Sequence, residues 1–163
     1  NVTIRVKDDD GWLRGEAIPK VVMVKYNRYV KDGALSRADE EVEVFARIEK
    51  NLKDRLLSGF VAEGISGTVH EPLEKALDVA SLSGMPVVRV SRDNEETMVS
   101  PNPSNLTIEG SNLSPLKARL LLMASLMRFG SLAPAADPRN PTPQEREAIR
   151  KKIEQYQEVF STH

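Results

Sequence analysis

The stretch from Leu57 to Arg92 reads LSGFVAEGISGTVHEPLEKALDVASLSGMPVVRVSR, which has the pattern of a strand, a loop, a helix and a second strand. The apolar run Phe60 to Ala62 is followed by a glycine-containing loop, Gly64 to Thr68. The β-branched run Pro86 to Val90 is typical of a buried strand. Strands joined through a helix cannot form a hairpin, so the stretch predicts a right-handed parallel crossover.

The helix inside this stretch is expected to start at Pro72, because proline is tolerated in a first turn. Its apolar face is predicted by residues at helical spacing: Leu73, Ala76, Leu77 and Ala80. Its charged residues are expected on the opposite side: Glu71, Glu74, Lys75 and Asp78. Gly84 is expected to end the helix.

The crossover brings the loop from Gly64 to His70 and the segment after Val90 to one edge of the sheet. In open α/β sheets this carboxyl edge is where ligands bind. The glycine loop, with Ser66 and Thr68, either cradles an anion with its backbone amides or only permits a tight turn. Two arginines at the end of the second strand either face a ligand or pair with the acidic loop that follows: Arg89 and Arg92, with Asp93, Glu95 and Glu96.

Composition excludes several classes of function. The chain has 163 residues, enough for one domain, and its 23 Lys and Arg against 24 Asp and Glu give no basic surface for nucleic acid. It has no cysteine and two histidines, so no metal-ligand spacing is present and no cofactor is expected. The apolar run Leu120 to Leu126 is too short to span a membrane. No signal-peptide pattern follows Asn1; the compartment stays open, with the cytoplasm favoured.

The remaining elements are predicted from local patterns. Alternation from Val2 to Val6, the turn Asp8 to Gly11, and Trp12-Leu13 predict a hairpin. Val21 to Val24 is expected to be the first strand of the main sheet. A helix starting at Ser36 is predicted by an apolar stripe: Val42, Phe45, Ile48, Leu52 and Leu56.

The carboxyl-terminal half predicts a loop, a short strand and two helices. The strand is expected at Leu106 to Ile108, after a hydrophilic loop. A helix from Ser114 to Gly130 is expected to be largely buried through a stripe of Leu116, Leu120, Met123 and Met127, widened by Leu121, Leu122, Ala124 and Leu126. A capping box at Thr142 to Glu145 opens the last helix, which is expected to pack through Ile149, Ile153, Tyr156 and Phe160. Together these elements predict a small α/β, flavodoxin- or Rossmann-like domain with a mainly parallel sheet of about four strands.

Two separated stretches resemble the carboxyl-terminal domain of the L-asparaginase family. Gly84 to Arg92, GMPVVRVSR, is similar to the family's strand that ends in V-V-R-x-S-R. Gly110 to Leu122, GSNLSPLKARLLL, is similar to its L-x-P-x-K-A-R-x-L-L helix. The opening strand at Pro19-Lys20-Val21 and the ending Val159 to His163 also resemble the family.

The resemblance implies a flavodoxin-like domain at 19–163, preceded by a hairpin or linker at 1–18 that follows a larger catalytic domain. That larger domain carries the nucleophilic threonines in T-G-G-T and H-G-T-D-T motifs, and neither motif occurs in this sequence. The chain alone is therefore expected to be inactive, with no catalytic residue of its own. In the family, this domain supplies an Asn and a Glu to the substrate site of a neighbouring subunit. Thr68 occupies the Asn position here; Glu96 and Glu95 are candidates for the Glu, with Glu109 a poorer one.

The resemblance accordingly implies part of an amidohydrolase that converts L-asparagine, or L-glutamine, to the acid and ammonia without a cofactor. Its partners would be the catalytic domain, further copies in a homo-oligomer, and a small amino acid. The substrate-binding residues would be Thr68, Ser66, Glu96 and Glu95, supported by Arg89 and Arg92. The alternative is a non-catalytic module of the same fold that binds a small ligand or forms dimers.

Overall fold

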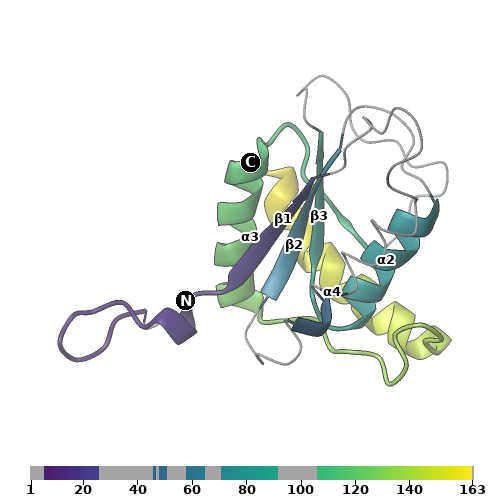
Figure 1. The fold of residues 1–163 in the computed structure, drawn as a ribbon, viewed down its shortest axis with the longest axis horizontal. Coiled ribbons are helices and arrows are strands. Elements are labelled where there is room, and N and C mark those ends of the chain that lie inside the picture. The colour runs from purple at the N-terminus through teal and green to yellow at the C-terminus, as the bar shows by residue number, and fades with distance from the viewer. Residues whose placement is uncertain are drawn as a thin grey trace.

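The structure is a computed structural model, which describes residues 6–25, 46, 48–50, 58–64, 71–91 and 106–162. Every structural statement below concerns these residues. Figure 1 shows strands between layers of helices. In chain order, the elements are η1 (Gly15–Ala17), β1 (Lys20–Lys25), β2 (Ser58–Gly64), α2 (Glu71–Leu82), β3 (Val87–Ser91), β4 (Ile108–Glu109), α3 (Pro115–Phe129) and α4 (Pro143–Ser161).

The strands form a four-stranded sheet in the order β1-β2-β3-β4, and each neighbouring pair is parallel. The parallel pairing of β2 with β3 through α2 confirms the predicted crossover. The first strand is confirmed as β1, and a short strand follows the hydrophilic loop as predicted, although β4 comprises Ile108–Glu109 and not Leu106 to Ile108. The domain is thus an α/β fold, consistent with a flavodoxin- or Rossmann-like architecture.

Two apolar clusters lie on the two faces of the sheet. On one face, Val61, Val88 and Val90 pack with residues of α3 and α4, among them Leu122, Leu126, Ile153 and Phe160. On the other face, Phe60, Ala62 and Val87 pack with Ala76, Leu77 and Ala80 of α2. Side chains that alternate along β2 and β3 therefore go to opposite layers, as a strand with a period of two requires.

The buried face of α3 differs from the predicted one. Leu116 and Leu120 were expected in the core, but they are 62% and 66% exposed. The residues that α3 buries are Ala118, Leu122, Ser125 and Leu126, of which Leu122 and Leu126 belong to the predicted apolar surface; Met123 of the predicted stripe is partly buried against the same core. The small side chains in this set let α3 lie close to the sheet: a Cβ on Gly59 of β2 would stand 3.0 Å from Leu122 Cδ2. α3 therefore turns toward the sheet the face that fits against Gly59, and it leaves Leu116 and Leu120 exposed.

Local capping signals in the carboxyl-terminal half are confirmed. The Ser114 side chain accepts a hydrogen bond from the Lys117 amide at the start of α3. The predicted capping box opens α4, where Thr142 and Glu145 bond each other's backbone amides. The predicted stripe of α4 is buried, including Tyr156, whose hydroxyl donates to the Gly130 carbonyl oxygen at the end of α3. This bond ties the ends of two helices together.

The predicted hairpin turn is present as an arm in front of β1. Lys7 and Leu13 form an antiparallel bridge, and the Asp8 carboxylate accepts hydrogen bonds from the amides of Asp10 and Trp12. In Figure 1 this arm extends away from the body. Residues 1–5 lie outside the described residues, as does most of the helix predicted from Ser36. No helix in the described part is both long and apolar enough to cross a bilayer.

Candidate functional site

The carboxyl edge of the sheet is defined by the ends of β2 and β3. Gly64, the last residue of β2, is the register partner of Ser91, the last residue of β3. β2 and β3 therefore end side by side, at the edge where open α/β sheets bind ligands, and the segments that follow them in the sequence are outside the described residues. Most predicted site residues belong to those segments and lie outside the described residues: Ser66, Thr68, Arg92, Glu95 and Glu96.

Of the predicted site residues, the structure describes Arg89 and the poorer candidate Glu109, which lies in β4. Arg89 was expected at the rim, but it lies inside β3, two residues before the strand ends, and is 2% exposed. Its position alternates with Val88 and Val90, so its side chain goes to the α2 layer. There its Nη1 donates to Glu74 Oε1 at 3.1 Å. Within the described residues, the arginine therefore pairs with a carboxylate of α2; the predicted acidic loop lies outside those residues.

The guanidinium of Arg89 has capacity beyond this pair. Among the described residues, no hydrogen-bond partner meets its Nε or Nη2, although both atoms are buried. Glu109 of β4 is the register partner of Arg89 on the neighbouring strand. Burial raises the pKa of Glu109, and the nearby Arg89 charge partly offsets that effect. The buried Arg89 and Glu74 and the partly buried Glu109 thus form a charge cluster near the carboxyl edge.

Two residues hold the β4 side of this cluster in place. A Cβ on Gly110 would lie 2.5 Å from Val90 Cγ1 and 2.7 Å from the Arg89 carbonyl oxygen, so a larger residue would push β4 away from β3. On the other side of β4, the Glu109 amide donates to Gln157 Oε1 at 2.8 Å, and Gln157 Nε2 donates to the Glu109 carbonyl oxygen at 3.1 Å. The side-chain amide of Gln157 therefore satisfies edge-strand backbone groups that a further strand would otherwise pair.

The sequence prediction missed Glu74 and Gln157. Glu74 was assigned to the solvent side of α2, yet it is 8% exposed. It precedes Leu77 by three residues and the buried Ser81 by seven, so helical spacing alone is compatible with a buried face that includes it. Gln157 likewise lies four residues after Ile153 and three before Phe160. Each of these polar side chains faces the protein because it has a hydrogen-bond partner there: Arg89 for Glu74, and the Glu109 backbone for Gln157.

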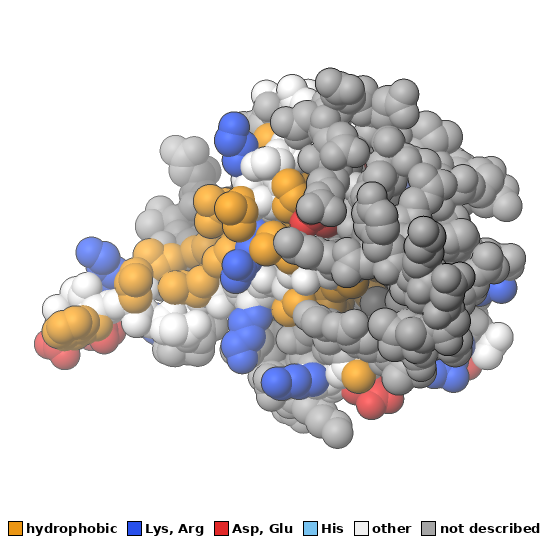
Figure 2. Space-filling model, turned by 45° about the horizontal axis from the view of Figure 1, so that its top comes forward, with side chains coloured by type: hydrophobic (Ala, Val, Ile, Leu, Met, Phe, Trp, Pro, Cys, Tyr) orange, Lys and Arg blue, Asp and Glu red, His pale blue; other side chains and the backbone are white. Residues whose placement is uncertain are grey.

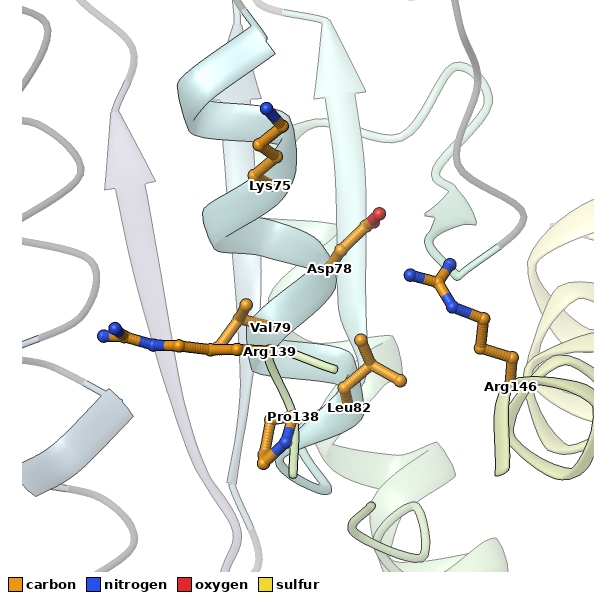
Figure 3. A pocket seen from close by; sticks show the side chains of 7 residues that line it. All are labelled: Lys75, Asp78, Val79, Leu82, Pro138, Arg139 and Arg146. Carbon is orange, nitrogen blue, oxygen red and sulfur yellow. The ribbon is translucent and has the colours of Figure 1, made fainter. Parts of the chain in front are cut away.

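A separate hollow of about 350 Å³ lies beside the later part of α2. Figure 3 shows Asp78 and Lys75 on the helix, Arg146 directed toward Asp78, and Arg139 directed away from it. Its apolar wall is made by Val79, Leu82 and Pro138. Its three basic side chains are exposed, so water screens them, and none of the predicted site residues lines it. The hollow is therefore a weaker candidate than the carboxyl edge.

The charge cluster holds the guanidinium of Arg89 in a fixed orientation. Among the described residues, Nε and Nη2 of Arg89 have no hydrogen-bond partner, and a guanidinium can donate two parallel hydrogen bonds to one carboxylate. An arginine paired with carboxylates is not a nucleophile, so this chemistry is binding and positioning. Within the described ranges, no group of His, Cys, Asp and Glu side chains could hold a metal ion.

Comparison with known proteins gave no match, either among family models or, at a significant level, among curated proteins. The asparaginase resemblance thus rests on its motifs alone.

Proposed function

We propose that this chain is the carboxyl-terminal domain of an asparaginase-type amidohydrolase, which helps to assemble the subunits and completes a neighbouring subunit's substrate site. The whole protein would hydrolyse the side-chain amide of L-asparagine or L-glutamine through a threonine acyl-enzyme supplied by its catalytic domain. This domain would bind the amino-acid end of the substrate and leave the chemistry to the other domain.

The pairing of Gly64 with Ser91 is the observation that supports this proposal most. The first residue precedes the segment with Ser66 and Thr68, and the second precedes the segment with Glu95 and Glu96. Because β2 and β3 end side by side, we propose that a hydroxyl from one segment and a carboxylate from the other bind the same small ligand. A carboxylate suits the substrate's ammonium group, and a hydroxyl suits its carboxylate.

The positions of the family-like stretches also support the proposal. The V-V-R-V-S stretch is β3, and its arginine is the buried centre of the charge cluster. The S-P-L-K-A-R stretch is the capped start of α3, which the Ser114 hydroxyl stabilises. Both stretches thus have a structural role: one is a strand of the sheet, and the other is the start of a helix that packs on the sheet.

The proposal is tested by expressing the complete coding sequence and measuring ammonia release from L-asparagine and L-glutamine. We expect saturable release from the complete protein and none above a blank from residues 1–163 alone. Absence of the T-G-G-T and H-G-T-D-T motifs upstream, together with no ammonia from the complete protein, would contradict the proposal. That outcome would favour a module without catalysis, for which exposed Leu116 and Leu120 are the supporting observation.

A further inference from the structure

The exposed face of α3 is apolar and basic. Leu116 and Leu120 lie one helical turn apart and are 62% and 66% exposed, and the exposed Ala124 continues their row. The charged residues of α3 are all basic, namely Lys117, Arg119 and Arg128. Exposed apolar residues of this size, gathered on one helix and rimmed by charge, mark an interaction surface rather than solvent-facing helix.

The amino-terminal arm carries complementary chemistry. Its Trp12 and Leu13 are 75% and 63% exposed and follow the acidic turn of Asp8, Asp9 and Asp10, which Lys7 and Arg14 flank in the sequence. Figure 2 shows hydrophobic and acidic side chains together at the outer end of the arm. On the adjoining body it shows further hydrophobic side chains with Lys and Arg beside them. A tryptophan that protrudes from a structured turn is the kind of residue that anchors an interface.

We propose that the arm of one copy docks on the α3 face of a second copy, with Trp12 and Leu13 against Leu116 and Leu120. The apolar residues would bury each other, and the acidic turn would lie among the basic residues of α3. The arm does not cover α3 of its own chain, since Trp12 is 75% exposed. Direct packing of two α3 helices is disfavoured, because it would bring basic residues of both copies together without any acidic residue of α3 between them.

Reciprocal docking closes the assembly. When each copy contributes one arm and one face, a two-fold axis satisfies both surfaces and leaves neither exposed. The inference rests on the assembly role in the proposed function and names its surface. Its test measures mass, whereas the catalytic proposal is tested by ammonia release, so the two can fail separately.

The experiment uses sedimentation velocity on the purified chain between about 1 and about 100 µM, the range in which interfaces of modest affinity dissociate. We expect a concentration-dependent dimer. Trp12→Ser on the arm and Leu120→Glu on α3 should each raise the dissociation constant about tenfold or more, as loss of an interface anchor does. Gln155→Glu, which adds the same charge at an exposed position of α4, should leave it unchanged. Each variant is checked by circular dichroism for an unchanged fold.

Mixing distinguishes this arrangement from other dimers. Trp12→Ser chains keep an intact α3 face and Leu120→Glu chains keep an intact arm, so an equimolar mixture can form one complete contact. We expect a heterodimer in the mixture at concentrations where each variant alone is monomeric. A wild-type monomer throughout the range would overturn the proposal. So would a dimer that Leu120→Glu disrupts and Trp12→Ser does not, because that pattern indicates packing of α3 on α3.

Discussion

The guanidinium of Arg89 and the carboxylate of Glu74 form an ion pair at 3.1 Å with side chains that are only 1% and 11% exposed. The pair joins the middle of β3 to α2 directly below the carboxyl edge. Burial makes such a pair costly to break and of little net benefit as a pair, because both ions lose their hydration. The pair therefore serves mainly to hold Arg89 in position, and the Nε and Nη2 of this arginine have no hydrogen-bond partner in the part of the chain that the structure describes.

Removal of one partner should therefore destabilise the fold more than removal of both. Glu74→Leu removes the carboxylate to which the buried Arg89 donates its hydrogen bond and should cost about 3–5 kcal/mol in urea unfolding. The double variant Glu74→Leu with Arg89→Met removes both charges and should recover most of that loss. Glu154→Ala serves as control, because it removes an exposed partner of Arg150 and should cost less than about 1 kcal/mol. A double variant as unstable as Glu74→Leu would mean that the charges themselves stabilise the fold.

The rotation of α3 can be tested with two leucines of the same helix. Leu122 is fully buried and Leu120 is 66% exposed. Leu122→Ala should reduce the free energy of unfolding by about 2–5 kcal/mol, as buried leucine truncations do. Leu120→Ala should change it by less than about 0.5 kcal/mol, the usual range for surface positions. Measurements are made at a concentration where the chain is monomeric. Similar losses for both variants would show that α3 faces the sheet differently.

Gln157 should matter more than its position near the end of α4 suggests. Gln157→Ala removes two hydrogen bonds to the Glu109 backbone and should cost about 1–3 kcal/mol, since it leaves edge groups of β4 without partners. Gln155→Ala, an exposed change of the same type in the same helix, should have little effect. Faster hydrogen exchange at the Glu109 amide in Gln157→Ala would locate the loss at β4. Equal exchange in both variants would exclude the bond between helix and strand.

Glu109 gives the fold a pH dependence of known sign. Burial raises its pKa in the folded state, so its contribution to stability is present below the ordinary value of 4.5 and declines as pH rises through the raised folded value. Glu109→Gln should therefore raise the midpoint of urea unfolding at neutral pH, and the difference from wild type should shrink as pH falls toward 4.5. Glu158→Gln, at an exposed site of α4, is the control. A difference that grows on acidification would reverse this assignment.

Hydrophobic periodicity and the residues that cap or end helices were sufficient to predict most of the architecture. The β-branched runs became neighbouring parallel strands, and Gly84, Ser114 and Thr142 mark helix boundaries, because these signals depend on local backbone chemistry. The face of α3 was not predictable in this way. Two apolar stripes compete on that helix, and the choice between them depends on Gly59, which lies in a distant strand.

The candidate site was predictable only in part, for a similar reason. The shared edge follows from the crossover, and the pairing of Gly64 with Ser91 confirms it. The buried Arg89 pairs with Glu74, a residue whose place at the border of the apolar face of α2 let its charge assign it to the solvent side. Long-range partners of this kind are not encoded in local spacing. Ser66, Thr68, Glu95 and Glu96 remain predictions from the sequence.

The most direct measurement of the central claim is steady-state ammonia release by the complete protein carrying Thr68→Val or Glu96→Gln. If this domain binds the substrate without performing its chemistry, each change should raise KM and leave kcat mostly intact, because the lost contact is made equally in ground and transition states. Thr68→Asn, which restores an amide at that position, should lower KM. Glu158→Gln is again the control. Unchanged KM in all three variants, with folding intact, would contradict the claim and reduce the domain to a scaffold.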